Sequence, residues 1–317
     1  MSSNSERLDL DGAAIVLVVG VSGAGKTTFI NHMAESTLGT EGEGQACTQA
    51  YTYSRNMIKI NHKWHNVAFI DTPGFDDPYK PDVAVFTALA TWMAQNIRNR
   101  KITAVFYFDS ILGSRFPLSS QRNFRMISLF VGMEAIQNVF LVSTHWDLVN
   151  TGMLETWTAL RRKRHFERMY NLTFCTTLPC FAVGVDDDAQ YHEVIARAIE
   201  AQPTFLQIQA EMEKGVELWE TEAGVEVVRE LKCQIASEKS QNAKACRVVN
   251  SGTSKEPGLA ERAYKESNKM LERLESGLGD GNGISWLQTA RAFGSEHKKK
   301  AVSGLLVVGG LIVGLVM

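Results

Sequence analysis

The stretch Gly20-Val21-Ser22-Gly23-Ala24-Gly25-Lys26-Thr27 matches the phosphate-binding loop pattern GxxxxGK[ST] at every specified position. Residues 13–19 (AAIVLVV) predict a buried strand before it, and residues 28–34 predict the start of a helix. The glycines let successive backbone N–H groups converge on phosphates at a helix N-terminus. An ordinary glycine-rich turn is the alternative. The Lys-Thr pair and the preceding strand favour a site for a nucleoside triphosphate.

Each part of this loop has a predicted role at the phosphates. Lys26 is expected to reach the β- and γ-phosphates, and the Thr27 hydroxyl is placed to ligate Mg²⁺. The remaining residues expected to surround the phosphates are Gly20, Ser22, Gly23, Ala24, Gly25 and Thr28.

Composition limits the possible classes of protein. A chain of 317 residues that is 44% hydrophobic can hold one large domain and a smaller appendage. Its net charge of −2 gives no reason to expect a nucleic-acid partner. The five cysteines lack CxxC spacing and no signal peptide is visible, so we expect reduced thiols rather than disulfides or a zinc site. Residues 1–11 are polar and are expected to be disordered.

A second motif, Asp71-Thr72-Pro73-Gly74, follows the strand-like residues 67–70. A strand that ends in Asp71 puts a carboxylate beside the magnesium ion, usually through a bound water. Gly74 can bring its N–H against a γ-phosphate where a side chain would crowd it. Alone, this tetrapeptide is a common turn. After a phosphate-binding loop, it favours a switch GTPase over a kinase of small molecules.

The third motif is Thr144-His145-Trp146-Asp147, which follows the apolar residues 139–143. Most GTPases have NKxD here, with an Asp that accepts hydrogen bonds from guanine. Asp147 occupies that position, while Thr144 and His145 replace Asn and Lys, and the His145 ring can stack beside the base. The alternative is a strand end with a solvated Asp. The replacements leave the strength of guanine over adenine selectivity open.

These motifs together resemble the septin-related branch of GTPases that contains the GIMAP proteins, the Toc GTPases of the chloroplast envelope and fungal G-domain proteins, the fungal group most closely. Residues 104–116, 123–126, 206–212 and 220–224 add weaker similarity. The resemblance covers about residues 13–235, and only the nucleotide motifs are highly specific. It implies a GTPase that binds GTP or GDP with Mg²⁺ and forms a homodimer across its nucleotide faces. Members of this branch are often attached to membranes.

Two more residues are candidates within this resemblance. Thr48, just before the strand predicted at residues 51–60, is the best candidate to close on Mg²⁺ and the γ-phosphate, with Thr40 as the competitor. Phe75 follows Gly74 where a Ras-like enzyme has a Gln that orients water, so intrinsic hydrolysis should be slow. Arg115 corresponds to an arginine that acts across the GIMAP dimer, or it is a surface salt-bridge partner.

The remaining pattern predicts an α/β fold, a three-layer P-loop NTPase with a doubly wound, mostly parallel sheet and the nucleotide at the strands' C-terminal ends. Strands are expected at 102–108 and 179–184, and helices at 81–98, 121–131, 154–170 and 191–199. Residues 12–202 would form this G domain, with a second guanine-facing loop at 183–186. The basic run at 161–165 fits a solvated helix face, a lipid contact or a nuclear signal.

A helical extension is expected over residues 203–297. Apolar residues recur every three or four positions from Ile208 to Leu231, which predicts a long amphipathic helix that packs on the G domain or pairs with another helix. A polar breaker at 250–258 precedes a second helix at 259–274.

The last residues predict an apolar C-terminal tail helix. Residues 301–317 form a charge-free stretch after Lys298-Lys299-Lys300. As a helix they span about 26 Å, against roughly 30 Å of bilayer hydrocarbon. The predicted anchor would place the G domain on the cytosolic face of the endoplasmic reticulum or the mitochondrial outer membrane, with the former favoured because no basic residue follows. A buried terminal helix is the alternative.

Two classes of function fit these motifs. The first is a membrane-anchored GTPase that dimerisation stimulates, and the second is a GTP-bound scaffold that has lost hydrolysis.

Overall fold

The structure is a computed structural model that describes residues 10–34, 51–77, 82–112, 118–149, 178–184 and 188–251. It also describes the single residues Leu160, Lys163, Arg164, Glu167, Lys265 and Asn268.

A six-stranded sheet forms the centre of the domain, in the order β2-β3-β1-β4-β5-β6. Its strands are β1 (Ala14–Gly20), β2 (Thr52–Ile60), β3 (Lys63–Asp71), β4 (Ala104–Ser110), β5 (Val139–Thr144) and β6 (Cys180–Ala182). All neighbours are parallel except β2 and β3, which form an antiparallel hairpin. The predicted α/β fold with a mostly parallel sheet is therefore confirmed.

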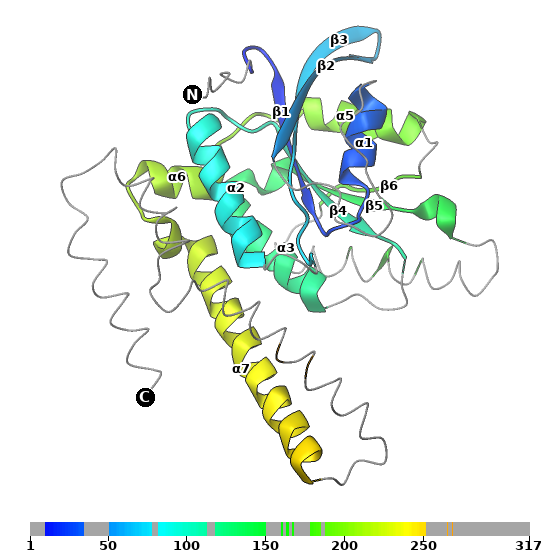
Figure 1. Cartoon of the computed structure of the whole chain (residues 1–317). Helices are drawn as coiled ribbons and strands as arrows, with labels where there is room; N and C mark the ends of the chain where they lie inside the picture. The colour runs from blue at the N-terminus through cyan, green and yellow to red at the C-terminus, as the bar shows by residue number, and fades with distance from the viewer. Residues whose placement is uncertain are drawn as a thin grey trace, which may run out of the picture.

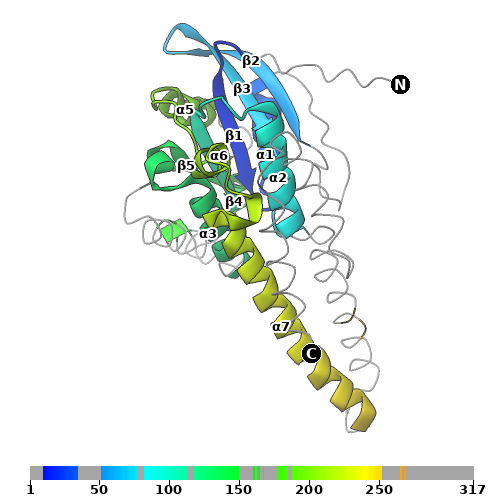
Figure 2. The ribbon, with the colours of Figure 1, turned by 90° about the vertical axis from the view of Figure 1, so that its left-hand side faces the viewer.

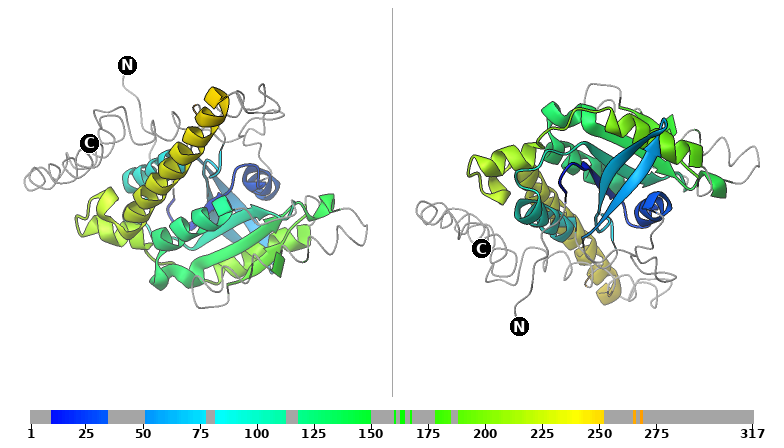
Figure 3. Two further views of the ribbon diagram at one scale, coloured as in Figure 1. Left: turned by 90° about the horizontal axis from the view of Figure 1, so that it is seen from below. Right: turned by 90° about the horizontal axis from the view of Figure 1, so that it is seen from above.

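Helices cover both faces of this sheet (Figures 1 and 3). One layer holds α1 (Lys26–Ala34) and α5 (Asp188–Ile199). The other holds α2 (Asp82–Asn96), α3 (Leu118–Val131), α6 (Gln207–Glu213) and α7 (Glu222–Ser251). The side chains of β1 alternate between the two cores: Leu17 and Val19 face the α2 layer, and Val16 and Val18 face the α1 layer. Burial on both faces explains why this strand is a continuous apolar run.

The apolar stripe from Ile208 to Leu231 does not form one helix, so that prediction is wrong in its continuity. The chain leaves α6 after Glu213 and turns at Gly215, whose φ of +84° is in the left-handed region. A short 3-10 helix, η3 (Leu218–Glu220), follows. The Thr221 hydroxyl then accepts a hydrogen bond from the Gly224 N–H at 3.0 Å, which caps the start of α7.

This extension packs on the G domain rather than standing apart from it. Leu206, Leu218, Val227 and Leu231 belong to the same buried cluster as the apolar residues of β1, α2 and α3. The Gln209 side chain links α6 to the residues that follow α2. Its amide donates to the carbonyls of Ile97 and Arg100, each at 3.0 Å, and its oxygen accepts from Leu206 N–H at 2.9 Å.

The second half of α7 extends away from the sheet (Figure 2). Where burial is described beyond Ile235, its side chains are exposed or half-buried, and the Asn242 amide donates to Asn268 Oδ1 at 2.7 Å. Within the described residues, no helix has both the length and the apolar character needed to cross a membrane. Most of the helix predicted at 154–170, nearly all of that at 259–274 and the whole tail at 301–317 lie outside the described residues.

Candidate functional site

The phosphate-binding loop connects the end of β1 to the start of α1. Gly20 has a φ of +144°, and a Cβ at this position would lie 2.1 Å from the carbonyl oxygen of Phe108 on the neighbouring strand β4. Only glycine fits such an approach. Gly23 and Gly25 also have positive φ values, +71° and +79°. The predicted loop therefore has the turned backbone that its glycines indicated.

Lys26 is buried, with its side chain folded over this loop. Its ammonium donates to the carbonyl oxygens of Val21 at 2.9 Å and Gly20 at 3.4 Å. A Cβ on Gly74 would lie 3.0 Å from the same Nζ atom. The charged end of Lys26 thus lies where the first and second motifs meet.

Thr27 and Asp71 meet at the C-terminal ends of β1 and β3. The Thr27 hydroxyl donates to Asp71 Oδ2 at 2.6 Å, and both side chains are buried. The Thr72 hydroxyl donates to the Val18 carbonyl at 2.8 Å, which fixes the chain just after Asp71. A hydroxyl and a carboxylate beside a phosphate-binding loop are the oxygen ligands that Mg²⁺ prefers, so the side chains present fit this ion.

The second motif continues along the phosphate-binding loop as a short parallel pairing. Phe75 N–H donates to Gly20 O at 3.0 Å, and Ser22 N–H donates to Phe75 O at 2.7 Å. A Cβ on Gly74 would lie 2.4 Å from Ser22 Cα, so this position also requires glycine. The Phe75 ring is 0% exposed and belongs to the core under α2 and α3. It packs in the interior of the domain.

The third motif is bound to the first through Thr144. Its hydroxyl donates to the Ala24 carbonyl at 3.0 Å and lies 3.1 Å from His145 Nδ1. A Cβ on Gly25 would lie 3.8 Å from Thr144 Cγ2. Thr144 therefore joins the end of β5 to the phosphate-binding loop, although it replaces the usual Asn.

His145 and Asp147 form the turn after β5. His145 has a φ of +65°, and the 3-10 helix η2 (Trp146–Leu148) follows it. Burial lowers the pKa of His145 and so favours the neutral imidazole, an effect that the Asp147 carboxylate opposes. Asp147 is exposed, and a Cβ on Gly184 would lie 3.8 Å from its Oδ1. The predicted second guanine-facing loop thus begins beside Asp147, while residues 185 and 186 lie outside the described part of the chain.

Thr48, Thr40 and Arg115 lie outside the described residues, and their roles stay predictions. Conversely, three residues near the site escaped the sequence reasoning: Asp109, Ser143 and Trp146. Asp109 is buried at the end of β4, and a single carboxylate in an otherwise apolar strand is a pattern that could have indicated it. Ser143 and Trp146 occupy positions that no nucleotide-binding pattern specifies.

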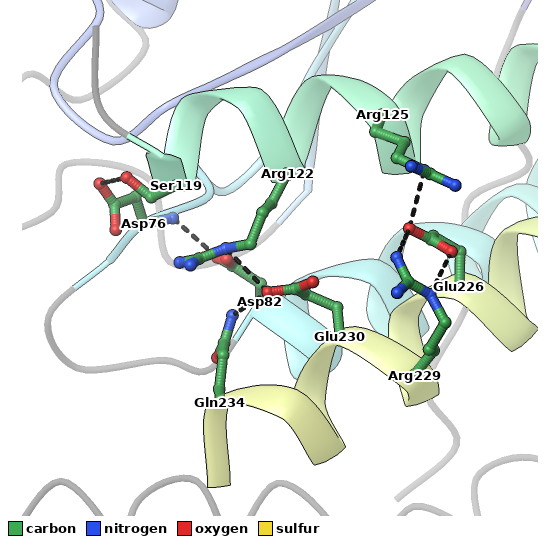
Figure 4. A network of polar contacts seen from close by, with 9 residues as sticks. All are labelled: Asp76, Asp82, Ser119, Arg122, Arg125, Glu226, Arg229, Glu230 and Gln234. Carbon is green, nitrogen blue, oxygen red and sulfur yellow. Dashed lines mark hydrogen bonds and ion pairs between the residues drawn. The ribbon is translucent and has the colours of Figure 1, made fainter. Parts of the chain in front are cut away.

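A polar network connects the turn after the second motif to α2, α3 and α7 (Figure 4). Asp76 N–H donates to Asp82 Oδ1 at 2.7 Å, and the Ser119 hydroxyl donates to Asp76 Oδ2 at 2.9 Å. Arg122 of α3 forms an ion pair with Glu230 of α7 at 3.1 Å. Asp82, Arg122 and Glu230 help to line a cleft of about 600 Å³ between the three helices.

A second ion-pair group lies further along the same two helices. Glu226 of α7 contacts Arg125 of α3 at 2.9 Å and Arg229 of its own helix at 2.6 Å. The hydrogen bonds from Arg229 lower the pKa of Glu226, while partial burial opposes this. The extension is thus held to α3 by charge as well as by apolar contacts.

A comparison with sequence families agrees with the geometry of the first two motifs. Residues 15–112 match the sequence family described as 50S ribosome-binding GTPase. No curated protein sequence is significantly similar to the chain. Among solved structures, Toc33 from Arabidopsis thaliana with Mg²⁺ and GMPPNP has 13% identity and a TM-score of 0.46, covering 63% of this chain and 85% of Toc33. Era from Aquifex aeolicus with GDP and AlF4⁻ has 15% identity and a TM-score of 0.44, covering 61% of this chain and 58% of Era.

Residues 15–112 therefore match a P-loop GTPase G domain. The family match spans the first and second motifs and ends before the third at Thr144.

Proposed function

We propose that this protein is a membrane-attached GTPase of the septin-related branch, closest to the fungal group, that hydrolyses GTP slowly and is stimulated when two G domains meet. The observation that carries this proposal is the convergence of all three motifs at one edge of the sheet. Thr27 contacts Asp71, Gly74 touches the phosphate-binding loop, and Thr144 binds Ala24. Polar groups on neighbouring parallel strands form a nucleotide site at such an edge.

Each site residue that the structure describes has a role that its position supports. Lys26 would neutralise the β- and γ-phosphates, the backbone of residues 20–25 would donate N–H groups to them, and Thr27 and Asp71 would hold Mg²⁺. The ion would supply positive charge that offsets the negative charge of the phosphates. Asp147, beside Gly184, would accept hydrogen bonds from the guanine ring. Thr48 is assigned to close on the γ-phosphate.

Slow intrinsic hydrolysis follows from Phe75. Its ring is packed in the core and has no polar group with which to orient an attacking water. A partner must therefore supply chemistry to the transition state. We assign this role to Arg115 of a second copy of the chain. An arginine finger in trans raises the rate about 10³- to 10⁵-fold in enzymes that use one.

The test is GTP hydrolysis by the purified full chain over a wide range of protein concentration, with ATP in parallel. We expect the rate per molecule to rise with concentration for GTP only. Arg115→Ala should abolish the rise, while Arg100→Ala, whose exposed side chain pairs with Asp11, should preserve it. A flat rate would refute stimulation by a dimer, and equal use of ATP would refute the role of Asp147.

The scaffold is the second candidate, and the buried Phe75 ring favours it equally. In a scaffold, GTP binds tightly and holds an oligomer together without turnover. Tight GTP binding, a stable oligomer and no hydrolysis at any concentration would select this function.

Membrane attachment is assigned to residues 301–317, on the cytosolic face of the endoplasmic reticulum or the mitochondrial outer membrane. A charge-free apolar stretch after three lysines supports this assignment. A fluorescent fusion of the full chain should mark one of these membranes and resist carbonate extraction. Deletion of 301–317 should release it. Retention of the shortened protein on membranes would refute the tail as the anchor.

A further inference from the structure

Trp146 is the residue of the third motif to which no role has been assigned. It lies between His145 and Asp147 at the start of η2, and its side chain is half-buried. Its indole N–H donates to the Ser143 hydroxyl at 3.0 Å. The Lys163 ammonium lies 5.7 Å from the centre of the ring. The indole is therefore held from two sides.

Ser143 connects this indole to the rest of the sheet. It is buried near the end of β5, and its hydroxyl donates to the Phe181 carbonyl of β6 at 2.9 Å. Its own carbonyl accepts from Val183 N–H at 2.8 Å. One buried serine therefore binds the turn that carries Asp147 and the strand that leads to Gly184.

The direction of the Asp147 carboxylate depends on the turn that carries it. Its side chain is exposed on a three-residue helix that follows a left-handed residue. Thr144 is committed to the carbonyl of Ala24, and His145 replaces the Lys of the usual motif. A carboxylate that recognises a base must be held close to its productive geometry by neighbouring contacts.

We propose that Trp146 is a positioning residue for base selection, whose indole, held by Ser143, sets the turn so that the Asp147 carboxylate faces the N1–H and exocyclic amine of guanine. This inference rests on the proposed guanine-binding role of Asp147 and deepens it. The indole acts through Asp147 and does not touch the phosphates, so it affects the choice of base rather than nucleotide binding in general.

The test uses Trp146→Phe in the full chain, because phenylalanine keeps an aromatic ring and loses the N–H donor. Affinities for GDP and ADP are measured by calorimetry. We expect GDP binding to weaken about tenfold, the scale of one impaired hydrogen bond to a charged group, and ADP binding to be unchanged. Ser143→Ala, which removes the acceptor instead, should shift the ratio of the two affinities in the same direction.

A double-mutant cycle with Asp147→Ala separates positioning from a general structural effect. If Trp146 acts through Asp147, Trp146→Phe should cost nothing further once the carboxylate is absent. Trp64→Phe is the matched control, because Trp64 is 62% exposed on the β2–β3 hairpin, away from the strand ends that carry the site.

Two results would overturn the inference: equal weakening of GDP and ADP binding, or the same loss with and without the Asp147 carboxylate. If Trp146→Phe does not fold, Ser143→Ala decides on the same criteria. A wild-type protein that binds GDP and ADP equally would instead refute the proposed function, which keeps the two failures distinct.

Discussion

Gly74 is the residue at which the second motif touches the phosphate-binding loop. Its Cα is so close to Ser22 that an added Cβ would lie 2.4 Å from Ser22 Cα and 2.5 Å from Ser22 N. Both are backbone atoms, so no side-chain rotation can relieve the contact. The backbone bonds of Phe75 to Gly20 and Ser22 hold the same pairing in place.

Gly74→Ala should therefore separate the second motif from the loop. We expect at least a tenfold loss of GTP hydrolysis, in line with the sensitivity of phosphoryl transfer to misplacement of about 1 Å, with the fold preserved. Single-turnover hydrolysis and thermal unfolding check this. Gly12→Ala is the control: it adds only the strain of a φ of +69°, with no atom within 4 Å. Unchanged hydrolysis in Gly74→Ala would contradict the close approach.

Asp82 makes stability depend on pH. Burial raises the pKa of Asp82 to about 6 from an ordinary 3.8; the Asp76 N–H and Arg122 lower it, and the carboxylates of Asp76 and Asp77 add to the rise. The native state therefore holds a proton that the unfolded chain has released between about pH 4 and 6. Stability from this group is greatest below that window and falls as pH rises through it.

Asp82→Asn should remove this loss of stability with rising pH. Its amide oxygen can still accept the hydrogen bond from Asp76 N–H. At pH 7.5 we expect the free energy of unfolding of the variant to exceed that of the wild type by about 1–2 kcal/mol, a value reduced because Asp82 is partly exposed. At pH 4 the two proteins should be equally stable. Urea unfolding at both pH values measures the difference. Asp11→Asn, an exposed aspartate paired with Arg100, should leave the pH dependence intact. A wild-type pH slope in Asp82→Asn would show that another group causes it.

Among the elements, those with the strongest local pattern are the ones that the sequence predicts. The apolar runs of β1, β4 and β5 and the periodic stripe of α2 are visible because burial on one or two faces imposes them. The motif residues Lys26, Thr27 and Asp71 were also predicted, because phosphate and Mg²⁺ chemistry fixes their type and spacing.

Elements and contacts that depend on distant partners escaped prediction. The helix breaks between α6 and α7 because the chain turns at Gly215 and Thr221 caps the start of α7. Apolar residues keep their helical spacing across this break, so the sequence pattern does not reveal it. The bond from Thr144 to Ala24 and that from Trp146 to Ser143 are set by how β5 meets its neighbours. No local pattern encodes such pairings.

The buried side chain of Gln209 makes hydrogen bonds where α6 packs beside the end of α2. Gln209→Ala would remove the hydrogen bonds that the Leu206 N–H and the carbonyls of Ile97 and Arg100 make with this buried side chain. We expect the free energy of unfolding to fall by about 2–4 kcal/mol. Urea denaturation checks it, with Gln234→Ala as control, since that half-buried glutamine makes one 3.5 Å bond to Glu230. A loss no larger than the control's would show that the packing of α6 beside α2 does not need these bonds.

In the whole molecule, one core joins the G domain to its extension. Leu10 near one end of the described chain and Ile235 on α7 belong to the same buried cluster. The domain boundary predicted at residue 202 stays a prediction, and the packing offers a direct test of it.

A chain that ends at Gln202 should not unfold cooperatively, because the apolar side chains that complete its core are missing. The buried residues removed include Leu206, Ile208, Leu218, Val227 and Leu231. A chain that ends at Ser251 should keep a sharp thermal transition and bind little ANS. Circular dichroism and dye binding compare the two. Cooperative unfolding of the shorter chain within a few degrees of the longer one would contradict a shared core.

The central position of β1 also has a consequence for synthesis in the cell. This strand is translated before its partners β3 and β4, and the core above it closes only with Ile235. At about 5–20 residues per second, roughly 10–40 s pass between translation of Gly20 and of Ile235. During that interval this apolar strand has no complete set of partners. Nascent chains of this protein should therefore depend on chaperones that shield apolar segments until α7 has been made.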